Sequence, residues 1–181
     1  MHQTLLHGSA FRLEQSDAAA MSAMRTEADA MRILRGAVRE PIAAYLRETS
    51  GGMNNLRVSI RQRMVGEARN AIAALFGGIY RLKHVFVFDE DIDIYDDAKV
   101  LWAVMTRTQA DRSFFQVPGS YISRVDPTGY PPWQAGPGAP RLLSTRLGID
   151  ATKPLDPSFP ETAEPPKWRD LRPDDYLEEP R

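Results

Sequence analysis

The stretch VFVFDEDIDIYDD, residues 85–97, decides the fold because four apolar residues run directly into a patch of six carboxylates. Together with His84, the apolar run predicts a strand that is buried on both faces and is therefore central in a sheet. Asp96 or Asp97 is placed to cap the next helix. That helix is expected over residues 97–108, with four side chains facing inward: Val100, Leu101, Val104 and Met105.

Residues 17–36 show the spacing of an amphipathic helix. Ser16 or Asp17 is the expected cap and Gly36 the expected stop. The positions that recur at helical spacing are Met21, Met24, Ala28 and Met31, and the series extends to Leu34 or Arg35. We interpret this methionine stripe as adaptable packing, either in the core or at an interface.

The segments between these two helices, and the one after them, complete an alternation of strands and helices. Strands are expected at residues 41–49, 56–63 and 113–117. A further helix is expected at residues 66–76, ended by Gly77 and Gly78. This order predicts an α/β fold in which helices pack on a mixed sheet, with an α+β arrangement as the alternative.

Three regions follow from this pattern and from the distribution of proline. Residues 1–36 form an N-terminal segment and helix, residues 37–125 the α/β core, and residues 126–181 a proline-rich arm and tail. Twelve of the fourteen prolines lie in the last region, so we expect neither a helix nor an inner strand there. Its large aromatic residues should fold back on the core or wrap a neighbouring chain: Tyr130, Trp133, Trp168 and Tyr176.

Composition argues against several classes of partner. A net charge of −1 gives no field that would attract nucleic acid or an anionic membrane. No apolar run approaches the length of a membrane span, and no secretory leader pattern is present. The absence of cysteine excludes thiolate chemistry and fits a reducing cytoplasm.

The acidic patch resembles several known sites and matches none fully. A calcium loop starting at Asp89 would have Ile94 where glycine is needed and Val100 where the bidentate glutamate belongs. A magnesium phosphohydrolase using Asp89 and Asp91 would need a lysine and further acids on later loops, and a glycosyltransferase would need a nucleotide-binding glycine pattern. The alternative is that these residues end a strand, cap a helix and are otherwise solvated.

A second charged group lies on the strand at residues 56–63. Arg57, Arg61 and Arg63 alternate along it and could bind an anion. Alternating arginines on a strand are more often simply solvated, with the apolar residues of the other face buried.

Three segments together closely resemble the carboxyl-terminal part of UbiD-family decarboxylases, which use prenylated FMN. They are GGMNNLRVSIRQRMVGEARNAIAALFG, KHVFVFDEDIDIYDDAKVLWAVMTRTQADR and GIDATKP. The resemblance runs from about Phe11 to Pro154 and does not extend to GYPPWQAGPGAP or to the tail. It implies an assembly domain or small subunit of a carboxy-lyase that acts on an aromatic or α,β-unsaturated acid.

The resemblance also implies what this chain lacks. The catalytic residues of the family and the ligands of its metal ion lie upstream, in the flavin-binding half, so no catalytic or metal-binding residue is expected here. Lys153 looks like the family lysine that approaches the flavin phosphate. The expected partners are further copies of the chain and a flavin-binding large subunit that holds the prenylated FMN. The competing interpretations are a non-enzymatic interaction module of the same fold and the magnesium phosphohydrolase.

Overall fold

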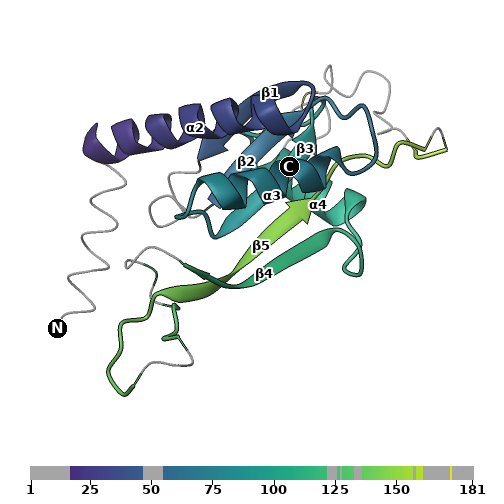
Figure 1. Cartoon of the computed structure of the whole chain (residues 1–181). Helices are drawn as coiled ribbons and strands as arrows, with labels where there is room; N and C mark the ends of the chain where they lie inside the picture. Colours follow the sequence, from purple (N-terminus) through teal and green to yellow (C-terminus); the bar gives the residue numbers. More distant parts are fainter. Residues whose placement is uncertain are drawn as a thin grey trace, which may run out of the picture.

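A computed structural model describes residues 17–46, 55–121, 126, 128–132, 136–156, 158–160 and 172 of the chain (Figure 1). Within them, three helices accompany one five-stranded sheet. The helices are α2 (Asp17–Ala37), α3 (Glu67–Gly78) and α4 (Asp97–Arg107). The strands are β1 (Pro41–Leu46), β2 (Asn55–Ile60), β3 (His84–Asp89), β4 (Phe114–Tyr121) and β5 (Leu143–Asp150).

The sheet is mixed, with the order β1-β2-β3-β5-β4. Strands β2, β3 and β5 are parallel to one another, while β1 and β4 are antiparallel edge strands. β3 is central, and Val85, Val87 and Phe88 are fully buried in it. The predictions of a mixed α/β sheet and of a central apolar strand are therefore confirmed.

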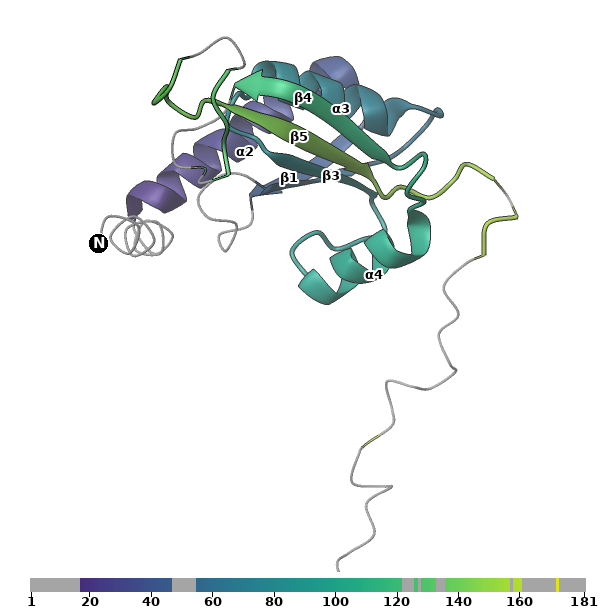
Figure 2. The same cartoon turned by 90° about the horizontal axis from the view of Figure 1, so that it is seen from below.

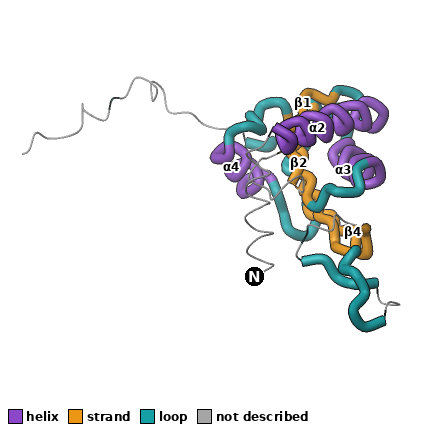
Figure 3. The backbone as a smooth tube through the Cα atoms, turned by 90° about the vertical axis from the view of Figure 1, so that its left-hand side faces the viewer, coloured by secondary structure: helices purple, strands orange, loops and turns teal. Residues whose placement is uncertain are grey.

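Helices cover both faces of the sheet. α2 and α3 lie on one face and α4 on the other, as Figures 2 and 3 show from two directions. The larger core cluster joins α2 and α3 to β1, β2 and β3, with Leu34, Ile72 and Leu75 fully buried. A smaller cluster under α4 includes Phe88, Ile94 and Ala103. None of the helices in the described part of the chain has the length and apolarity of a bilayer span.

The expectation that the proline-rich region holds no inner strand is wrong. β5 lies between β3 and β4, so the division expected at residue 126 separates two paired strands of one sheet. The reason is local, since residues 141–150 contain no proline, although prolines lie on both sides of the segment. Tyr130 folds back as expected, with an isolated bridge to Leu143 and a hydroxyl that accepts a hydrogen bond from Gly119 N–H at 3.1 Å. Trp133, Trp168 and Tyr176 lie outside the described residues.

The buried faces of two helices also differ from those expected. On α2 Met21 and Met24 are exposed, whereas Met31 is partly buried against the core and Leu34 is fully buried, as expected. The buried face of α2 also includes Thr26 and Ala30. On α4 Val100 is buried as predicted, but Leu101 and Met105 are exposed. On each helix, small or short side chains on the buried face let the helix backbone lie close to the sheet. The buried side of the helix therefore differs from the side that carries its largest apolar residues.

Arg57 corrects the prediction of a solvated arginine face on β2. Its side chain is buried beneath the loop that follows β3, donating to the Ile94 carbonyl at 3.0 Å and to the Asp97 carboxylate at 2.7 Å. Both faces of β2 are consequently buried, as suits a strand between two neighbours in a covered sheet. Arg61 and Arg63, beyond the strand, are partly exposed and pair with Glu40.

Candidate functional site

The candidate site lies where the parallel strands end. Strands β2, β3 and β5 run in the same direction, so their carboxyl ends meet at one edge of the sheet. Asp89 ends β3, Asp150 ends β5, and Gln62 follows β2. In open α/β sheets this edge is where ligands usually bind. The loop after β5, residues 151–156, begins here and carries Lys153.

Lys153 is held at three of its atoms. Its backbone N–H donates to Asp89, and its carbonyl accepts from the Gln62 side chain at 3.3 Å. Its ammonium lies 3.2 Å from the Asp91 carboxylate. The structure therefore brings together all three of the residues singled out at this edge, Asp89, Asp91 and Lys153. They form an ion-paired cluster rather than a pair of open carboxylates.

Arg107, at the end of α4, completes the cluster. Its guanidinium donates to both oxygens of Asp91, at 2.9 and 2.7 Å, and lies 3.6 Å from Asp89. The Arg107 side chain is 1% exposed, with its guanidinium carbon 5.4 Å from the ring centroid of Trp102. Such a fork-to-carboxylate pair is both stronger and more directional than a lysine pair.

The two carboxylates have pKa values shifted in opposite directions. Burial raises the pKa of Asp89, more than the hydrogen bond from Lys153 N–H and the charge of Arg107 lower it. Burial also opposes the ionisation of Asp91, but hydrogen bonds and charge from Arg107 and Lys153 outweigh burial and lower the pKa of Asp91. Asp91 is therefore the firmly ionised member of the pair.

A second set of contacts fixes the loop that carries Lys153. Thr152 Oγ1 lies 2.6 Å from the Asp150 carboxylate and 2.8 Å from the Gln62 side-chain oxygen. The Thr152 N–H donates to the same Asp150 oxygen at 3.1 Å. The loop is thus tied to β5 by Asp150 and to the end of β2 by Gln62.

This arrangement does not favour a magnesium phosphohydrolase. Both candidate ligands, Asp89 and Asp91, are already engaged by Arg107 and Lys153. Across the described parts of the chain, no group of three or more aspartate, glutamate or histidine side chains is arranged to hold a metal ion. A metal ion here would have to displace a buried arginine from its carboxylate, at the cost of leaving that charge unpaired.

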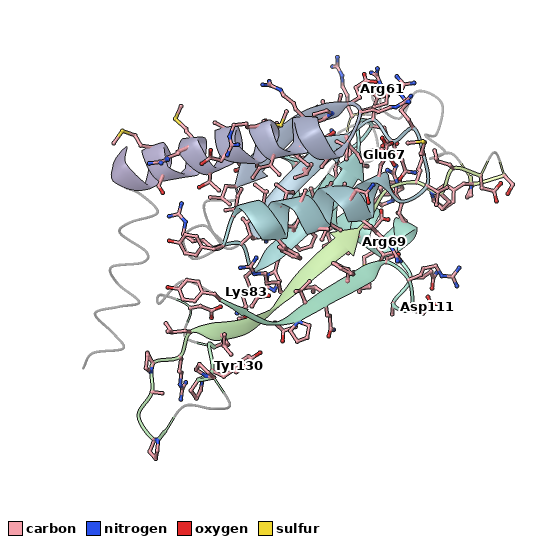
Figure 4. All side chains as sticks on the ribbon, in the orientation of Figure 1. Arg61, Glu67, Arg69, Lys83, Asp111 and Tyr130 are labelled. Atoms are coloured by element: carbon pink, nitrogen blue, oxygen red, sulfur yellow. The ribbon has the colours of Figure 1, made fainter. Side chains whose placement is uncertain are left out.

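Acidic residues of the patch outside the cluster have structural roles. Asp96 caps α4 by accepting from the N–H groups of Ala98 and Lys99, which confirms the prediction of a cap. Glu90 is exposed and pairs with Arg61 at 2.6 Å. Figure 4 shows Arg61 with Glu67 at the end of α3 that adjoins this edge of the sheet.

Three residues of the site escaped sequence reasoning: Gln62, Arg107 and Thr152. A signal for Arg107 was present, because it follows Val100 and Ala103 at helical spacing on the buried face of α4. An arginine on such a face needs a carboxylate partner, and the acidic patch supplies one. Gln62 and Thr152 carry no comparable signal, since only the folded sheet brings them together.

Comparison with known proteins shows which family this chain resembles. Residues 19–151 match the model of the 3-octaprenyl-4-hydroxybenzoate carboxy-lyase C-terminal domain. The chain belongs to the UbiD family. The UbiD-type domain is 35% identical over 130 residues to anhydromevalonate phosphate decarboxylase of Aeropyrum pernix, covering 72% of this chain and 28% of the relative. It is 28% identical over 140 residues to gallate decarboxylase of Lactiplantibacillus plantarum, covering 75% of this chain and 29% of the relative.

A solved structure shows the same domain in a longer chain. The UbiD-class enzyme HmfF from Pelotomaculum thermopropionicum, in complex with FMN, superposes with a TM-score of 0.71 and 32% identity. The alignment covers 88% of this chain and 34% of HmfF. The UbiD-type domain therefore spans about a third of the length of the relatives that it matches.

Proposed function

We propose that this chain is the carboxyl-terminal assembly domain, or a small subunit, of a UbiD-type carboxy-lyase that acts on an aromatic or α,β-unsaturated acid. The observation that carries the proposal is the fixed ammonium of Lys153 at the carboxyl edge of a UbiD-type sheet. The names of the relatives support it, since gallate decarboxylase and anhydromevalonate phosphate decarboxylase both remove carbon dioxide from an acid. On this proposal, the catalytic residues belong to a flavin-binding part that lies outside the matched domain.

Lys153 fits contact with a phosphate group and does not by itself form a cofactor site. An ammonium has three donors, and Asp91 engages one of them. The neighbouring cation, Arg107, is buried and already bonded to Asp91, so it is not available to a phosphate. Prenylated FMN, when bound by the flavin-binding part, supplies the reactive carbon centre. This chain contributes one wall of the cleft and a single cationic contact.

A hybrid enzyme tests this proposal. HmfF in which the matched third is replaced by the full chain should retain FMN and decarboxylase activity. Lys153→Met in the hybrid should lower the FMN affinity about tenfold, the factor expected on loss of one charged hydrogen bond. Lys99→Met is the matched control, because Lys99 lies on α4 beside Asp96 and not at the edge of the sheet.

The proposal is contradicted by a hybrid that elutes as a folded particle but contains no FMN and has no activity. The role of Lys153 is contradicted if the Lys153→Met and Lys99→Met hybrids hold FMN equally well. In that case the chain would be an interaction module whose edge does not touch the cofactor.

A further inference from the structure

The fixation of Lys153 is unusual for a side chain that is 37% exposed. Most lysines at a surface move between rotamers, and their ion pairs contribute little for that reason. Here the backbone N–H, the carbonyl and the ammonium of one residue are each bonded to a different side chain: Asp89, Gln62 and Asp91. These three come from the end of β3, the loop after β2 and the loop after β3.

Asp91 can hold an ammonium in place only if Asp91 itself is fixed. Asp91 is 40% exposed at its side chain, and two of its bonds come from Arg107, one to each carboxylate oxygen. Arg107 is immobilised in turn by burial and by the Trp102 ring. The planar guanidinium of Arg107 bonds to both oxygens of Asp91 and so fixes the plane of that carboxylate. A single hydrogen bond would leave the carboxylate free to rotate.

We propose that Asp89, Asp91 and Arg107 are positioning residues that set where the Lys153 ammonium stands. Asp89 and Asp91 touch Lys153 directly, whereas Arg107 acts on it through Asp91. The contacts that fix Lys153 are independent of the proposed function. Only the use of a fixed ammonium, contact with a phosphate, rests on the proposed function. The inference assigns a function to Asp89 and Asp91 of the acidic stretch, which are engaged by Arg107 and Lys153.

The charges of the cluster add a further consequence. Its two carboxylates and two cations balance, and Asp150 adds a third carboxylate nearby, so the site exerts little attraction on a distant anion. Lys153 therefore recognises a phosphate by placement and not by an excess of positive charge. The phosphate must be brought to it by another polypeptide or another part of a longer chain.

Competitive acylation of lysine amines in the full chain tests the positioning. The chain has four lysines, so mass spectrometry resolves the acylation rate of each one. In the folded wild-type chain Lys153 should react more slowly than Lys99. Arg107→Lys and Asp91→Asn should each raise the rate at Lys153 about fivefold, the factor for an ion pair worth about 1 kcal/mol. Asp93→Asn is the control, because Asp93 pairs with Lys99 at 4.0 Å.

Arg107→Lys is the decisive variant because no contact joins Arg107 directly to Lys153 in the cluster. If Arg107 only stabilises the fold, Arg107→Lys lowers the unfolding temperature and leaves the rate at Lys153 unchanged, and that result overturns the proposal. A variant that does not fold shows all four lysines reacting at similar rates. Asp91→Asn then decides: an unchanged rate at Lys153 in folded Asp91→Asn protein also overturns it.

The HmfF hybrid separates this inference from the proposed function. If acylation responds as expected but Lys153→Met leaves FMN affinity unchanged, the positioning stands and the phosphate contact is wrong. If Lys153→Met lowers FMN affinity but Arg107→Lys changes neither acylation nor FMN affinity, the phosphate contact stands and the positioning is wrong. When both hold, Arg107→Lys should lower FMN affinity, whereas Asp93→Asn, which alters a pair outside the cluster, should not.

Discussion

Glu67 shows at the scale of one residue how an internal carboxylate can occupy an anion site made of backbone amides. It stands at the start of α3, is buried, and accepts hydrogen bonds from the N–H groups of Arg63, Met64 and Arg39. Hydrogen bonds from these amides, led by the one from Arg63, hold the pKa of Glu67 below its ordinary value of 4.5 despite burial. The loop between β2 and α3 therefore depends on one ionised side chain.

Replacing Glu67 by glutamine should lower the free energy of unfolding by about 2 kcal/mol at neutral pH. The NH2 group of the glutamine would lie against backbone N–H groups that the carboxylate now accepts from, and two donors cannot bond to each other. The folded pKa is lowered, so the contribution of Glu67 is present above the unfolded pKa near 4.5 and is lost as the pH falls through the folded value. The difference between wild type and variant in urea unfolding should shrink over that range. Glu90→Gln, which removes an exposed pair, is the control and should change stability little.

Individual elements show which parts of the fold could be predicted from sequence. β3 could be, because an uninterrupted apolar run needs burial on both faces wherever it lies. β5 could not, because prolines on both sides of it dominate the composition of the region although none lies within the strand. The buried sides of α2 and α4 depend on how close each backbone lies to the sheet. Lys153, Asp89 and Asp91 were singled out, whereas their connection through Arg107 exists only after α4 has packed.

The contact between α3 and β5 provides a test of how closely a helix packs on the sheet. A methyl group on Gly148 would stand 2.3 Å from Ile72 Cγ2, and Ile72 is fully buried with no space to move. We expect Gly148→Ala to lower the free energy of unfolding by about 1–3 kcal/mol in urea titrations, the usual cost of overpacking. Gly77→Ala on α3 is the matched control, since its methyl group would meet nothing within 4 Å. It should leave stability unchanged or raise it. Equal effects from the two variants would show that Ile72 does not enforce a glycine at residue 148.

The whole molecule exposes more large apolar side chains than a small monomer usually does. They include Leu101 and Met105 on α4, Phe114 and Phe115 on β4, and Met21 and Met24 on α2. Monomers rarely leave such groups contiguous in water, and a two-fold dimer is the commonest remedy. An evolved form of HmfF is itself described as dimeric.

We therefore expect light scattering to give a mass above the 20.3 kDa of one chain at micromolar concentration. Replacing Leu101 and Met105 together by glutamate should weaken association at least tenfold, because charges would be buried at the contact. Met64→Glu, on the exposed loop before α3, is the control for the loss of an apolar surface residue. A single-chain mass at every concentration for the wild type would contradict the assembly role.

The purified chain should also bind no flavin by itself, because the single ammonium of Lys153 is its only expected contact with that cofactor. Equilibrium dialysis with FMN, with riboflavin as the control that lacks the phosphate, measures this directly. Stoichiometric retention of FMN by the isolated chain would show that it contains a cofactor site of its own.

The order of the strands has a consequence for how the protein is made. β5 is the last of the described strands in the sequence but lies inside the sheet, between two strands that are synthesised earlier. Until residue 150 has left the ribosome, one edge of β3 is unpaired and β4 has no neighbouring strand in the sheet. We expect a nascent chain that pauses before residue 143 to expose these unpaired backbone groups, which favours aggregation. The final strand closes the sheet in one step, so we expect folding to be late and cooperative rather than progressive along the chain.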